Sequence, residues 1–347
     1  MNQLEKDICN VYERKYGVYT GNGTTAMYLI FLALNNQNKK VIFPAISCTN
    51  PVNAAIYAGY KVDFCDVNLD NYTMDISYLE NMLKTGEYGI IVPTHIYGNI
   101  CDISAILQLS RKYNVIVLED AAQTFKLYGD DIAITSFGHT KLFETDEGGG
   151  IAFTNNRKLY EEINSKKKLL KVLNSKDAEI LYDKYRSEYY RIANGNNTEE
   201  EKNIKMKELQ LKSKDIFIYH NSDNAEILLK LSMRNNILQS RRESQQLYIK
   251  LLDKKYIELP NLTYDDEGLW RFSFIYNKDR KKLLEKVRSY GIDISSWYPS
   301  LAQIYKNQIL KNADIVSKRI VNLWISQEHS KEQIMDEIAI INNCMEE

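Results

Sequence analysis

Short apolar runs alternate with longer amphipathic stretches through the first 155 residues of the chain. The apolar runs predict strands at 40–46, 61–67, 88–96, 115–121, 132–137 and 150–155. The stretches between them predict helices at 24–36, 50–59, 76–84 and 102–113, the last with Asp102 as its N-cap. This alternation is typical of an α/β domain whose mainly parallel sheet is flanked by helices. In such sheets, ligands gather at the carboxyl ends of the strands.

The pattern changes at residue 158, where a charged, tyrosine-rich segment begins that continues to residue 215. Its helical spacing predicts solvated helices interrupted at 194–197, with a lid or a partner surface as the alternative. Beyond it the pattern predicts one long helix or two joined ones, then a strand, a helix and a closing amphipathic helix, at 224–255, 269–276, 279–291 and from residue 331. We therefore predict a large domain over 1–235 and a smaller C-terminal α+β domain over 236–347.

Composition narrows the functional classes. The chain has 347 residues, 44% of them hydrophobic, with 45 basic and 46 acidic residues and a net charge of −1. This balance gives no basic excess for nucleic acid or an anionic membrane. The longest apolar run, 26–34, is too short to span a bilayer, and the first ten residues lack an apolar signal core. The five cysteines form no CxxC pair, so we expect reduced thiols, a cytoplasmic location and no metal site.

A glycine-rich loop precedes the first predicted helix. Gly21, Gly23, Thr24 and Thr25 stand directly before a run of apolar residues. A helix start of this kind offers free N–H groups, hydroxyls and the positive end of the helix dipole, which together bind phosphate. The alternative is an ordinary glycine turn with a threonine N-cap. No GxGxxG follows a strand here, which disfavours a dinucleotide-binding fold.

Two opposite charges stand at neighbouring strand ends. Glu119 and Asp120 follow the apolar residues 115–118, and Lys141 follows the strand at 132–137. A lone acid at a strand end is often a cap or a salt-bridge partner, and most lysines are solvated. The alternative is a carboxylate that keeps the pyridine nitrogen of pyridoxal phosphate protonated, with a partly desolvated lysine that forms a Schiff base with its aldehyde. Ser136 could then bind the phosphate from the same strand end.

Several blocks together resemble one family. "NGTTAMYLIFLAL", "VIFPAISCTNPVNAAIYAGYKVDFCDVN", "THIYGNICDISAILQLSRKYNVIVLEDAAQ" and "SFGHTKLFETDEGGGIAFTN" are similar to consecutive blocks of the DegT/StrS sugar aminotransferases. These enzymes are fold-type I pyridoxal-phosphate proteins. The resemblance is strong over 21–155 and weaker from residue 224 onward. It implies a fold-type I transferase, with a large domain of mainly parallel sheet and a smaller C-terminal domain.

The resemblance also implies residue roles at the cofactor ring. Lys141 would form the Schiff base and move the proton between substrate and cofactor, while Asp120 would hold the pyridine nitrogen. Gln123 would lie beside the phenolic oxygen of the ring. His95 and His139 are candidates for contact with the substrate. For both histidines an ordinary structural role stays open, which for His95 is that of a hydrogen-bonded core histidine.

Phosphate contacts and departures from the family pattern complete the site. The resemblance implies that Thr24, Thr25 and Ser136 bind the phosphate. Cys48 stands where the family often stacks an aromatic ring on the cofactor. Asn221 is the candidate for an asparagine that reaches the phosphate of the neighbouring subunit. The charged segment 158–215 is longer than the resemblance leads us to expect.

The resulting hypothesis is an aminotransferase that works as a homodimer. Glutamate would donate the amino group, and a keto-sugar, nucleotide-linked in the main hypothesis, would accept it. One alternative is a smaller phosphorylated or cyclic ketone as acceptor, and another is a pyridoxal-phosphate-binding sensor without turnover. Dehydration of keto-sugars is disfavoured, because the resembling dehydratases carry histidine in place of the lysine.

Overall fold

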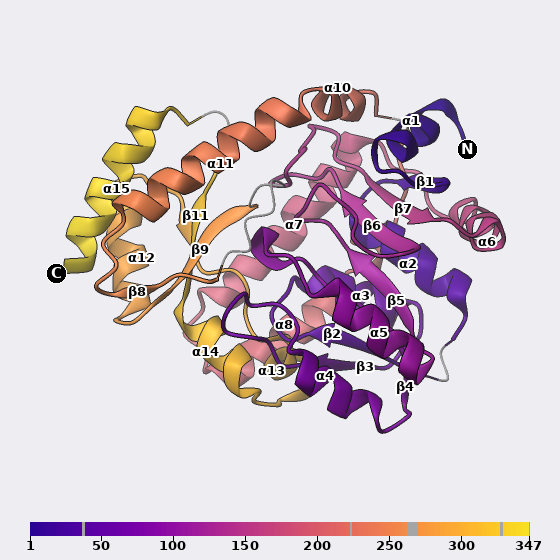
Figure 1. Ribbon diagram of the computed structural model, residues 1–347, viewed down its shortest axis with the longest axis horizontal. Coiled ribbons are helices and arrows are strands. Elements are labelled where there is room, and N and C mark those ends of the chain that lie inside the picture. The colour runs from indigo at the N-terminus through magenta and orange to yellow at the C-terminus, as the bar shows by residue number, and fades with distance from the viewer. Residues whose placement is uncertain (37–38, 223, 262–269, 327–328, 347) are drawn as a thin grey trace.

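The computed structural model describes residues 1–36, 39–222, 224–261, 270–326 and 329–346. Within these ranges the chain forms two sheets (Figure 1). The larger sheet has the strand order β1-β7-β6-β5-β4-β2-β3, and the smaller has the order β10-β11-β9-β8. Apolar clusters cover the larger sheet, and a separate cluster fills the core beside the smaller one. None of the described helices is long and apolar enough to cross a membrane.

The larger sheet is mainly parallel, as its sequence pattern predicts. Its strands are β1 (Tyr16–Thr20), β2 (Lys40–Pro44), β3 (Val62–Cys65), β4 (Tyr88–Ile91), β5 (Ile116–Asp120), β6 (Ile132–Ser136) and β7 (Gly150–Thr154). Only β7 runs against its neighbours among these strands. The carboxyl ends of β5 and β6 therefore meet at one edge of the sheet, where Asp120 and Ser136 lie.

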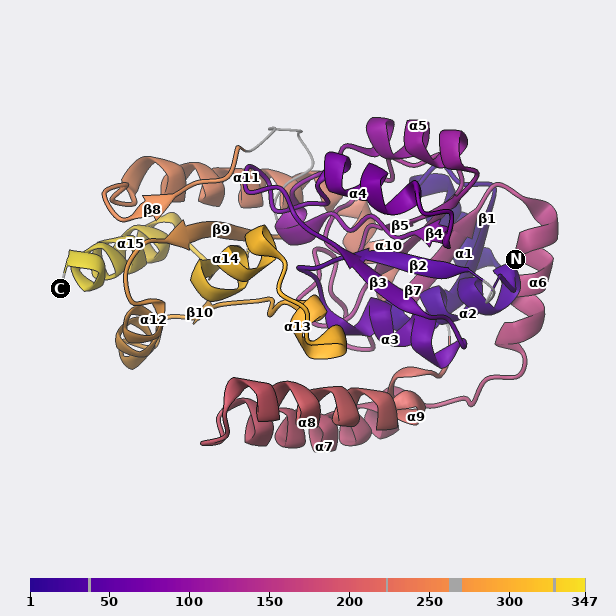
Figure 2. The ribbon, with the colours of Figure 1, turned by 90° about the horizontal axis from the view of Figure 1, so that it is seen from below.

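Helices cover both faces of this sheet. Figure 2 shows α4 and α5 on one face and α2 and α3 on the other. The helices of this part are α1 (Gln3–Val11), α2 (Gly23–Leu34), α3 (Thr49–Tyr57), α4 (Ile76–Leu83), the single turn η1 (Ile96–Gly98), α5 (Ile103–Tyr113) and α6 (Arg157–Lys167). Asp102 caps α5 by accepting a 2.9 Å hydrogen bond from the N–H of Ala105, as the sequence predicts.

The observed strands are shorter than the predicted runs at their carboxyl ends. The run 88–96 is the largest difference, since β4 ends at Ile91. Pro93 follows and has no N–H for a ladder, although its carbonyl accepts from the N–H of Asp120 at 2.9 Å. The pattern also leaves out α1 and β1, and β1 pairs with β7 across more than 130 residues of sequence.

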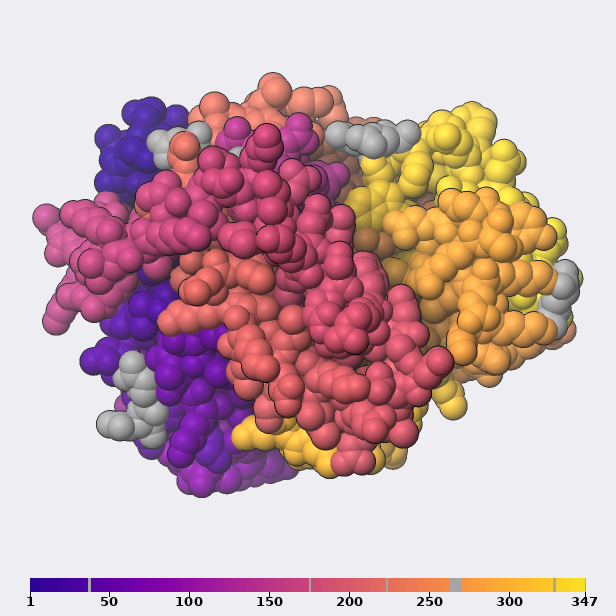
Figure 3. Space-filling model, turned by 180° about the vertical axis from the view of Figure 1, so that it is seen from behind, coloured from indigo at the N-terminus to yellow at the C-terminus, as the bar shows by residue number. Residues whose placement is uncertain are grey.

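The charged segment forms a helical hairpin outside α3, as expected for 158–215. Its helices are α7 (Ser175–Ala193), α8 (Glu199–Lys212) and the short α9 (Lys214–Phe217). They form a layer below α3 and α13 in Figure 2 and cover much of the face shown in Figure 3. A buried polar network holds the hairpin in place: the Asn53 amide donates to Gln210 Oε1 at 2.6 Å, and Gln210 donates to the hydroxyl of Tyr185.

The C-terminal part builds the smaller sheet. Its elements are α10 (Glu226–Ser232), α11 (Arg234–Leu251), β8 (Ile257–Glu258), β9 (Arg271–Tyr276), α12 (Arg280–Ser289), β10 (Ile294–Ser295), α13 (Leu301–Lys306), α14 (Lys311–Arg319), β11 (Ile320–Trp324) and α15 (Lys331–Glu346). Helix α11 runs across the top of the molecule from the larger sheet to the smaller one (Figure 1). The domain boundary at 235/236 stays a prediction.

Candidate active site

Asp120 ends β5 at the carboxyl edge of the larger sheet, where it is 3% exposed. Its Oδ1 accepts from the N–H of Ala122 at 3.1 Å, and its Oδ2 lies 3.5 Å from the hydroxyl of Thr94. Burial raises the pKa of Asp120, although the Ala122 bond and the charge of Lys141 oppose this. A buried carboxylate with so few donors is suited to a bound cation, such as a protonated pyridine nitrogen.

Glu119 precedes Asp120, and successive residues of a strand point to opposite faces of the sheet. Its carboxylate is fully buried and accepts from Tyr128 N–H at 2.7 Å and Gly129 N–H at 2.8 Å, while Oε1 lies 2.9 Å from His95 Nε2. Burial raises the pKa of Glu119, but these partners outweigh it and hold the pKa below its ordinary value. Glu119 is therefore a structural acid with its partners already in place.

His95 lies on the Glu119 side of β5 and is fully buried. Its Nδ1 accepts a 3.1 Å hydrogen bond from the N–H of Cys101, so its proton lies on Nε2, which donates to Glu119. Both ring nitrogens are thus engaged within the protein. This geometry favours the structural alternative for His95 over contact with a substrate.

Lys141 lies in the loop that joins β6 to β7. The N–H of Phe137 donates to the carbonyl of Gly149 at 2.9 Å and closes the base of this loop. Gly149 has φ = +129°, and a Cβ there would lie 2.9 Å from the ring of Tyr19. The glycine run following Lys141 therefore lets the loop turn back closely enough to begin β7.

The surroundings of Lys141 lower the pKa of its amine. Burial lowers the pKa of Lys141, nearby Cys48 and Asp120 oppose that shift, and the charge of Arg271 adds to it. Its Nζ lies 5.7 Å from the centre of the Trp270 ring. The structure thus places Lys141 and Asp120 close enough for each charge to influence the pKa of the other. A less basic amine is better able to attack an aldehyde.

The start of α2 closely approaches the end of β6, where the sequence predicts a phosphate cradle. Asn22 caps α2 by accepting a 2.8 Å hydrogen bond from the N–H of Thr25. A Cβ on Gly23 would lie 3.0 Å from Cβ and 3.4 Å from Oγ of Ser136, so glycine is what lets the helix start approach the end of β6. Gly23, Thr24 and Ser136 together present backbone N–H groups and hydroxyls of the kind that bind phosphate.

Thr25 joins the glycine loop to a distant segment. Its hydroxyl donates to the carbonyl of Phe217 at 2.8 Å and accepts from the N–H of Tyr219 at 3.2 Å. Asn22 donates to the same carbonyl at 3.0 Å. The expected contact of Thr25 with phosphate stays a prediction. Tyr219 also covers Gly21, where a Cβ would lie 2.3 Å from its ring.

Gln123 is held by an aromatic stack beside Lys141. Its Oε1 accepts from the N–H of Tyr97 at 2.6 Å, and its Nε2 donates to the hydroxyl of Tyr298 at 3.2 Å. The Tyr298 ring stacks on Tyr97, with centroids 6.0 Å apart, and on Trp270, with centroids 6.1 Å apart. These contacts fix the amide, and its place beside the phenolic oxygen of a cofactor stays a prediction.

Cys48 occupies the N-cap position of α3 and makes no side-chain capping bond. Burial raises the pKa of its thiol, and the charges of Lys141 and Asp120 act on it in opposite directions. The thiol therefore lies in the electrostatic field of both charged residues, on their side of the sheet. Its predicted position against the cofactor ring is consistent with this placement and stays a prediction.

His139 and Asn221 lie at the margin of the site. His139 is exposed, two residues before the lysine. Asn221 is 6% exposed, donates to the carbonyl of Glu147 at 3.4 Å, and its Oδ1 has no hydrogen-bond partner among the described residues. Both expected roles, at the substrate and at the neighbouring subunit, stay predictions. No group of three or more His, Cys, Asp or Glu in the described residues could hold a metal.

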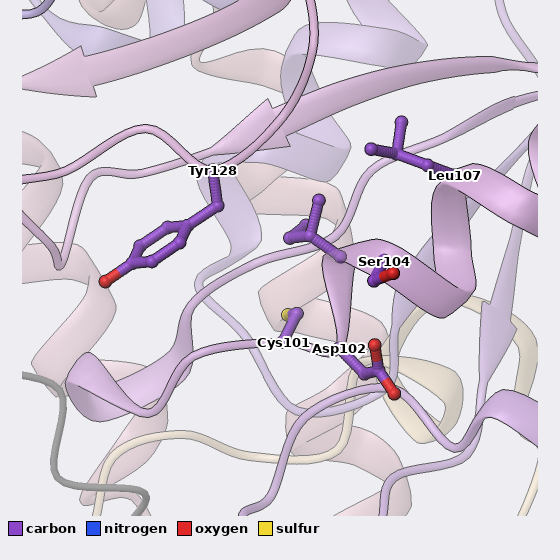
Figure 4. Close-up of a pocket in the computed structure, with 6 residues that line it drawn as sticks. Cys101, Asp102, Ser104, Leu107 and Tyr128 are labelled. Carbon is purple, nitrogen blue, oxygen red and sulfur yellow. The ribbon is translucent and has the colours of Figure 1, made fainter.

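A separate hollow of about 410 Å³ lies on the Glu119 side of β5. Figure 4 shows the ring of Tyr128 across from the start of α5, with Cys101 and Asp102 between them. Tyr128 and Cys101 are the residues that also bond to Glu119 and His95. This hollow is therefore distinct from the surroundings of Lys141.

The buried acid, the lysine of lowered pKa and the phosphate cradle fit pyridoxal phosphate. The model of the DegT/DnrJ/EryC1/StrS aminotransferase family matches residues 1–342. This chain belongs to that family. DegT/DnrJ/EryC1/StrS aminotransferases depend on pyridoxal phosphate, and that Lys141 is the residue that binds it stays a prediction.

Several curated proteins that this chain resembles are named as sugar transaminases or synthases. GDP-perosamine synthase of Escherichia coli O157:H7 is 31% identical over 170 residues, which are 46% of this chain and 46% of that protein. The 3-oxo-glucose-6-phosphate:glutamate aminotransferase of Bacillus subtilis is 26% identical and covers 90% of this chain and 66% of its own length. The match to the first of these proteins therefore spans less than half of its length.

Solved structures of the family share the fold over nearly the whole chain. Bacillus subtilis NtdA with bound PMP covers 99% of this chain and 77% of its own, with a TM-score of 0.73 and 21% identity. Helicobacter pylori PseC, an aminotransferase involved in the biosynthesis of pseudoaminic acid, covers 99% and 90%, with a TM-score of 0.74 and 17% identity. The fold-type I architecture expected from the sequence is confirmed.

Several residues of the site could not be found from local sequence. Phe217 and Tyr219 bind the glycine loop, Trp270 and Arg271 lie near the lysine, and Tyr298 stacks on Trp270. Tryptophan is rare in this chain, which has three, so the Trp-Arg pair at the start of β9 was a recognisable signal. Nothing in the local pattern marks the other three.

Proposed function

We propose that this chain is an aminotransferase that moves an amino group from glutamate to the ketone of a nucleotide-linked sugar. The observation that carries the proposal is the placement of Lys141, whose pKa is lowered by burial, beside the buried Asp120 in a chain of an aminotransferase family. When bound, the cofactor supplies an aldehyde that accepts the amino group and a ring that withdraws electrons from the reacting carbon.

Lys141 and Asp120 have complementary tasks. Nζ of Lys141, with its lowered pKa, takes a proton from the reacting carbon of the donor and returns one to the reacting carbon of the acceptor. The carboxylate of Asp120 holds positive charge at the pyridine nitrogen, which relieves the cost of burying that carboxylate alone. The amino group is carried between two half-reactions, so we expect ping-pong kinetics.

Other residues bind, orient and exclude water. Gly23, Thr24 and Ser136 hold the phosphate at the start of α2. Gln123, fixed by Tyr97 and Tyr298, is placed to donate to the phenolic oxygen. The stacked rings of Tyr97, Tyr298 and Trp270 form an apolar wall on this side of the site.

The relatives support a sugar as the acceptor. The names of two of them, GDP-perosamine synthase and the dTDP-3-amino-3,6-dideoxy-alpha-D-galactopyranose transaminase of Aneurinibacillus thermoaerophilus, refer to nucleotide-linked sugars. The second is 23% identical over 99% of this chain and 89% of its own length. The Bacillus subtilis relative, whose name includes glutamate, favours a sugar phosphate as the second candidate acceptor.

We infer that the protein is a cytoplasmic homodimer. The five unpaired cysteines support a reducing compartment. Large apolar side chains are exposed near α10 and before α7, which is suited to a subunit interface: Leu169 (81%), Val172 (63%) and Leu229 (59%). A fully active monomer in sedimentation at assay concentration would contradict the dimer.

Two measurements test the proposed function. The first is mass spectrometry of products from a panel of keto-sugar nucleotides and keto-sugar phosphates, each incubated with the enzyme and glutamate; an aminated product is expected. The second is borohydride reduction followed by peptide mapping, which should find the cofactor on Lys141. Loss of the yellow absorbance on adding glutamate separates an enzyme from a sensor, which would leave it unchanged.

A further inference from the structure

Arg271 lies at the start of β9 and is surrounded by every tryptophan of the chain. The centre of its guanidinium lies 4.2 Å from the ring of Trp324, 4.8 Å from Trp270 and 5.4 Å from Trp297. The sequence contains three tryptophans in all. Indole rings stack on the flat faces of a guanidinium and leave its N–H edges for a hydrogen-bonding partner.

The guanidinium of Arg271 is deeply buried but makes few hydrogen bonds within the described residues. Arg271 is 3% exposed, and within the described ranges its Nη1 donates only to the hydroxyl of Ser295, at a long 3.4 Å. Among the described residues its Nε has no hydrogen-bond partner, and no carboxylate lies within ion-pair distance of the guanidinium. Burial lowers the pKa of Arg271, and the charges of Asp293 and Glu144 oppose this shift without outweighing it.

Arg280 provides the contrast. It also belongs to the C-terminal part, and burial lowers its pKa too. Its Nη1, however, donates to the carbonyl of Ser317 at 2.6 Å and lies 3.4 Å from that of Ile320. Arg280 has the backbone partners of a structural arginine, and Arg271 lacks them within the part of the chain that the structure describes.

Arg271 and Lys141 share one aromatic ring. Trp270 lies 4.8 Å from the guanidinium and 5.7 Å from Nζ of Lys141, and the charge of Arg271 contributes to the lowered pKa of the lysine. A molecule whose amino group reacts at Lys141 therefore has a buried cation across the same aromatic ring. Arginine binds carboxylates through two parallel N–H bonds, and this geometry suits a guanidinium whose neighbours are aromatic rings.

We propose that Arg271 binds a carboxylate of the amino-acid donor, an assignment that rests on the proposed function of the site. The near-complete burial of the guanidinium fits a small carboxylate. A nucleotide diphosphate is bulky, stands several bonds from the sugar ketone and must extend toward the surface. Arg271 thus selects the donor and leaves the acceptor to other residues.

The test separates the two half-reactions. Arg271→Met removes the charge, Arg271→Lys keeps the charge and removes the fork, and Arg280→Lys is the matched control. In rapid mixing of the holoenzyme, Arg271→Met should weaken the apparent affinity for glutamate about 30-fold, with Arg271→Lys intermediate. The half-reaction with the amino acceptor should stay within about threefold of wild type. Arg280→Lys should leave both half-reactions unchanged.

Binding without turnover supplies a second readout. The tryptophans all adjoin Arg271, so their intrinsic fluorescence reports on this site. In the holoenzyme, 2-oxoglutarate should change this fluorescence saturably, inorganic phosphate should not, and Arg271→Met should abolish the response. If phosphate competes with 2-oxoglutarate, or if Arg271→Met impairs both half-reactions equally, the donor assignment is overturned.

The outcomes also distinguish this assignment from the proposed function. A wild-type protein that binds 2-oxoglutarate through Arg271 but runs neither half-reaction would refute the aminotransferase and retain the carboxylate site. If Arg271→Met runs both half-reactions normally and with unchanged affinity for glutamate, the carboxylate site is refuted and the aminotransferase function is retained. If Arg271→Met does not fold, Arg271→Lys carries the test, because a purely structural arginine would lower the melting temperature without a selective loss of donor affinity.

Discussion

Glu119 and Asp120 are neighbours at the end of β5, and the protein treats these two acids differently. Glu119 contacts His95 and two backbone N–H groups, and its pKa lies below its ordinary value. Asp120 accepts one bond of 3.1 Å and has one contact of 3.5 Å, and its pKa is raised. Both side chains are buried and both end the same strand.

The difference shows that burial alone does not mark a functional acid. Glu119 has the partners it needs, so it fixes His95 and the turn at 128–129 and has little capacity left for a ligand. Asp120 is left with unsatisfied acceptor capacity beside Lys141, and its environment becomes favourable only when a cation binds. The two sides of one strand thus separate a structural network from a binding site.

Replacing Asp120 tests this contrast most strongly. We expect Asp120→Asn to retain most of its cofactor and to lose roughly 100- to 1,000-fold in transamination, because an amide cannot hold the pyridine proton. The rate of the half-reaction with glutamate is measured from the loss of cofactor absorbance. Glu119→Gln is the control and should keep most of its turnover where it remains folded. Equal losses in both variants would break the comparison.

Stability should show the opposite order. Glu119→Gln places an NH₂ group where three donors now converge, and we expect it to destabilise the fold by about 3 kcal/mol. Asp120→Asn should not destabilise the apoprotein, because it removes an ill-satisfied buried charge. Urea unfolding of the two variant apoproteins measures their free energies of unfolding. A larger loss of stability in Asp120→Asn than in Glu119→Gln would contradict our description of both acids.

The two acids should also respond oppositely to pH. The folded pKa of Glu119 is lowered, so its contribution is present above its unfolded pKa of about 4.3 and is lost as the pH falls through the folded value. The folded pKa of Asp120 is raised, so its ionisation costs stability as the pH rises from about 3.9 through the folded value.

Melting curves of the apoprotein and holoprotein across this range provide the measurement. The stabilisation conferred by pyridoxal phosphate should increase as the pH rises from the unfolded to the folded pKa of Asp120. The reason is that the protonated cofactor nitrogen offsets the buried charge of the carboxylate. Asp120→Asn should flatten this increase. If the stabilisation of the wild-type protein by the cofactor does not vary with pH, the ionised Asp120 carboxylate does not destabilise the apoprotein.

Cys48 offers the smallest perturbation on the Asp120 side. Asp is a favoured N-cap, so Cys48→Asp should stabilise α3 by about 0.5–1 kcal/mol while weakening the cofactor about tenfold through a second anion. Cys48→Phe should tighten the cofactor by roughly 0.5–1.5 kcal/mol if the thiol faces the ring. Cofactor affinity and melting temperature are measured together. Unchanged affinity in a folded Cys48→Asp protein would place the thiol away from the ring.

Local pattern in the sequence was enough to predict the parts of the site that lie at strand ends. Each of these parts can be recognised from a few consecutive residues: the apolar run before Glu119, the glycine loop, and the lysine after β6. Because strand ends of a parallel sheet meet at one edge, these parts could be placed together from their order along the chain.

The remaining parts depend on contacts between distant segments. The bond from Thr25 to Phe217 spans 192 residues, and that from Gln123 to Tyr298 spans 175. The hydrophobic periodicity contains no trace of such pairings, so they could not be predicted from the sequence. The pattern also could not show that Glu119 has three partners and Asp120 so few, because Tyr128 and Gly129 donate through their backbone.

The bond from Thr25 to Phe217 has a consequence for the order in which the ribosome makes the protein. A nascent chain that has emerged only through β7 already contains the acid, the lysine and Ser136. Its glycine loop still lacks the carbonyl of Phe217 and the ring of Tyr219, which are translated after the helical hairpin. The contacts of the glycine loop are therefore completed late in synthesis, and a chain released before residue 219 carries Asp120 and Lys141 without the segment that fixes this loop.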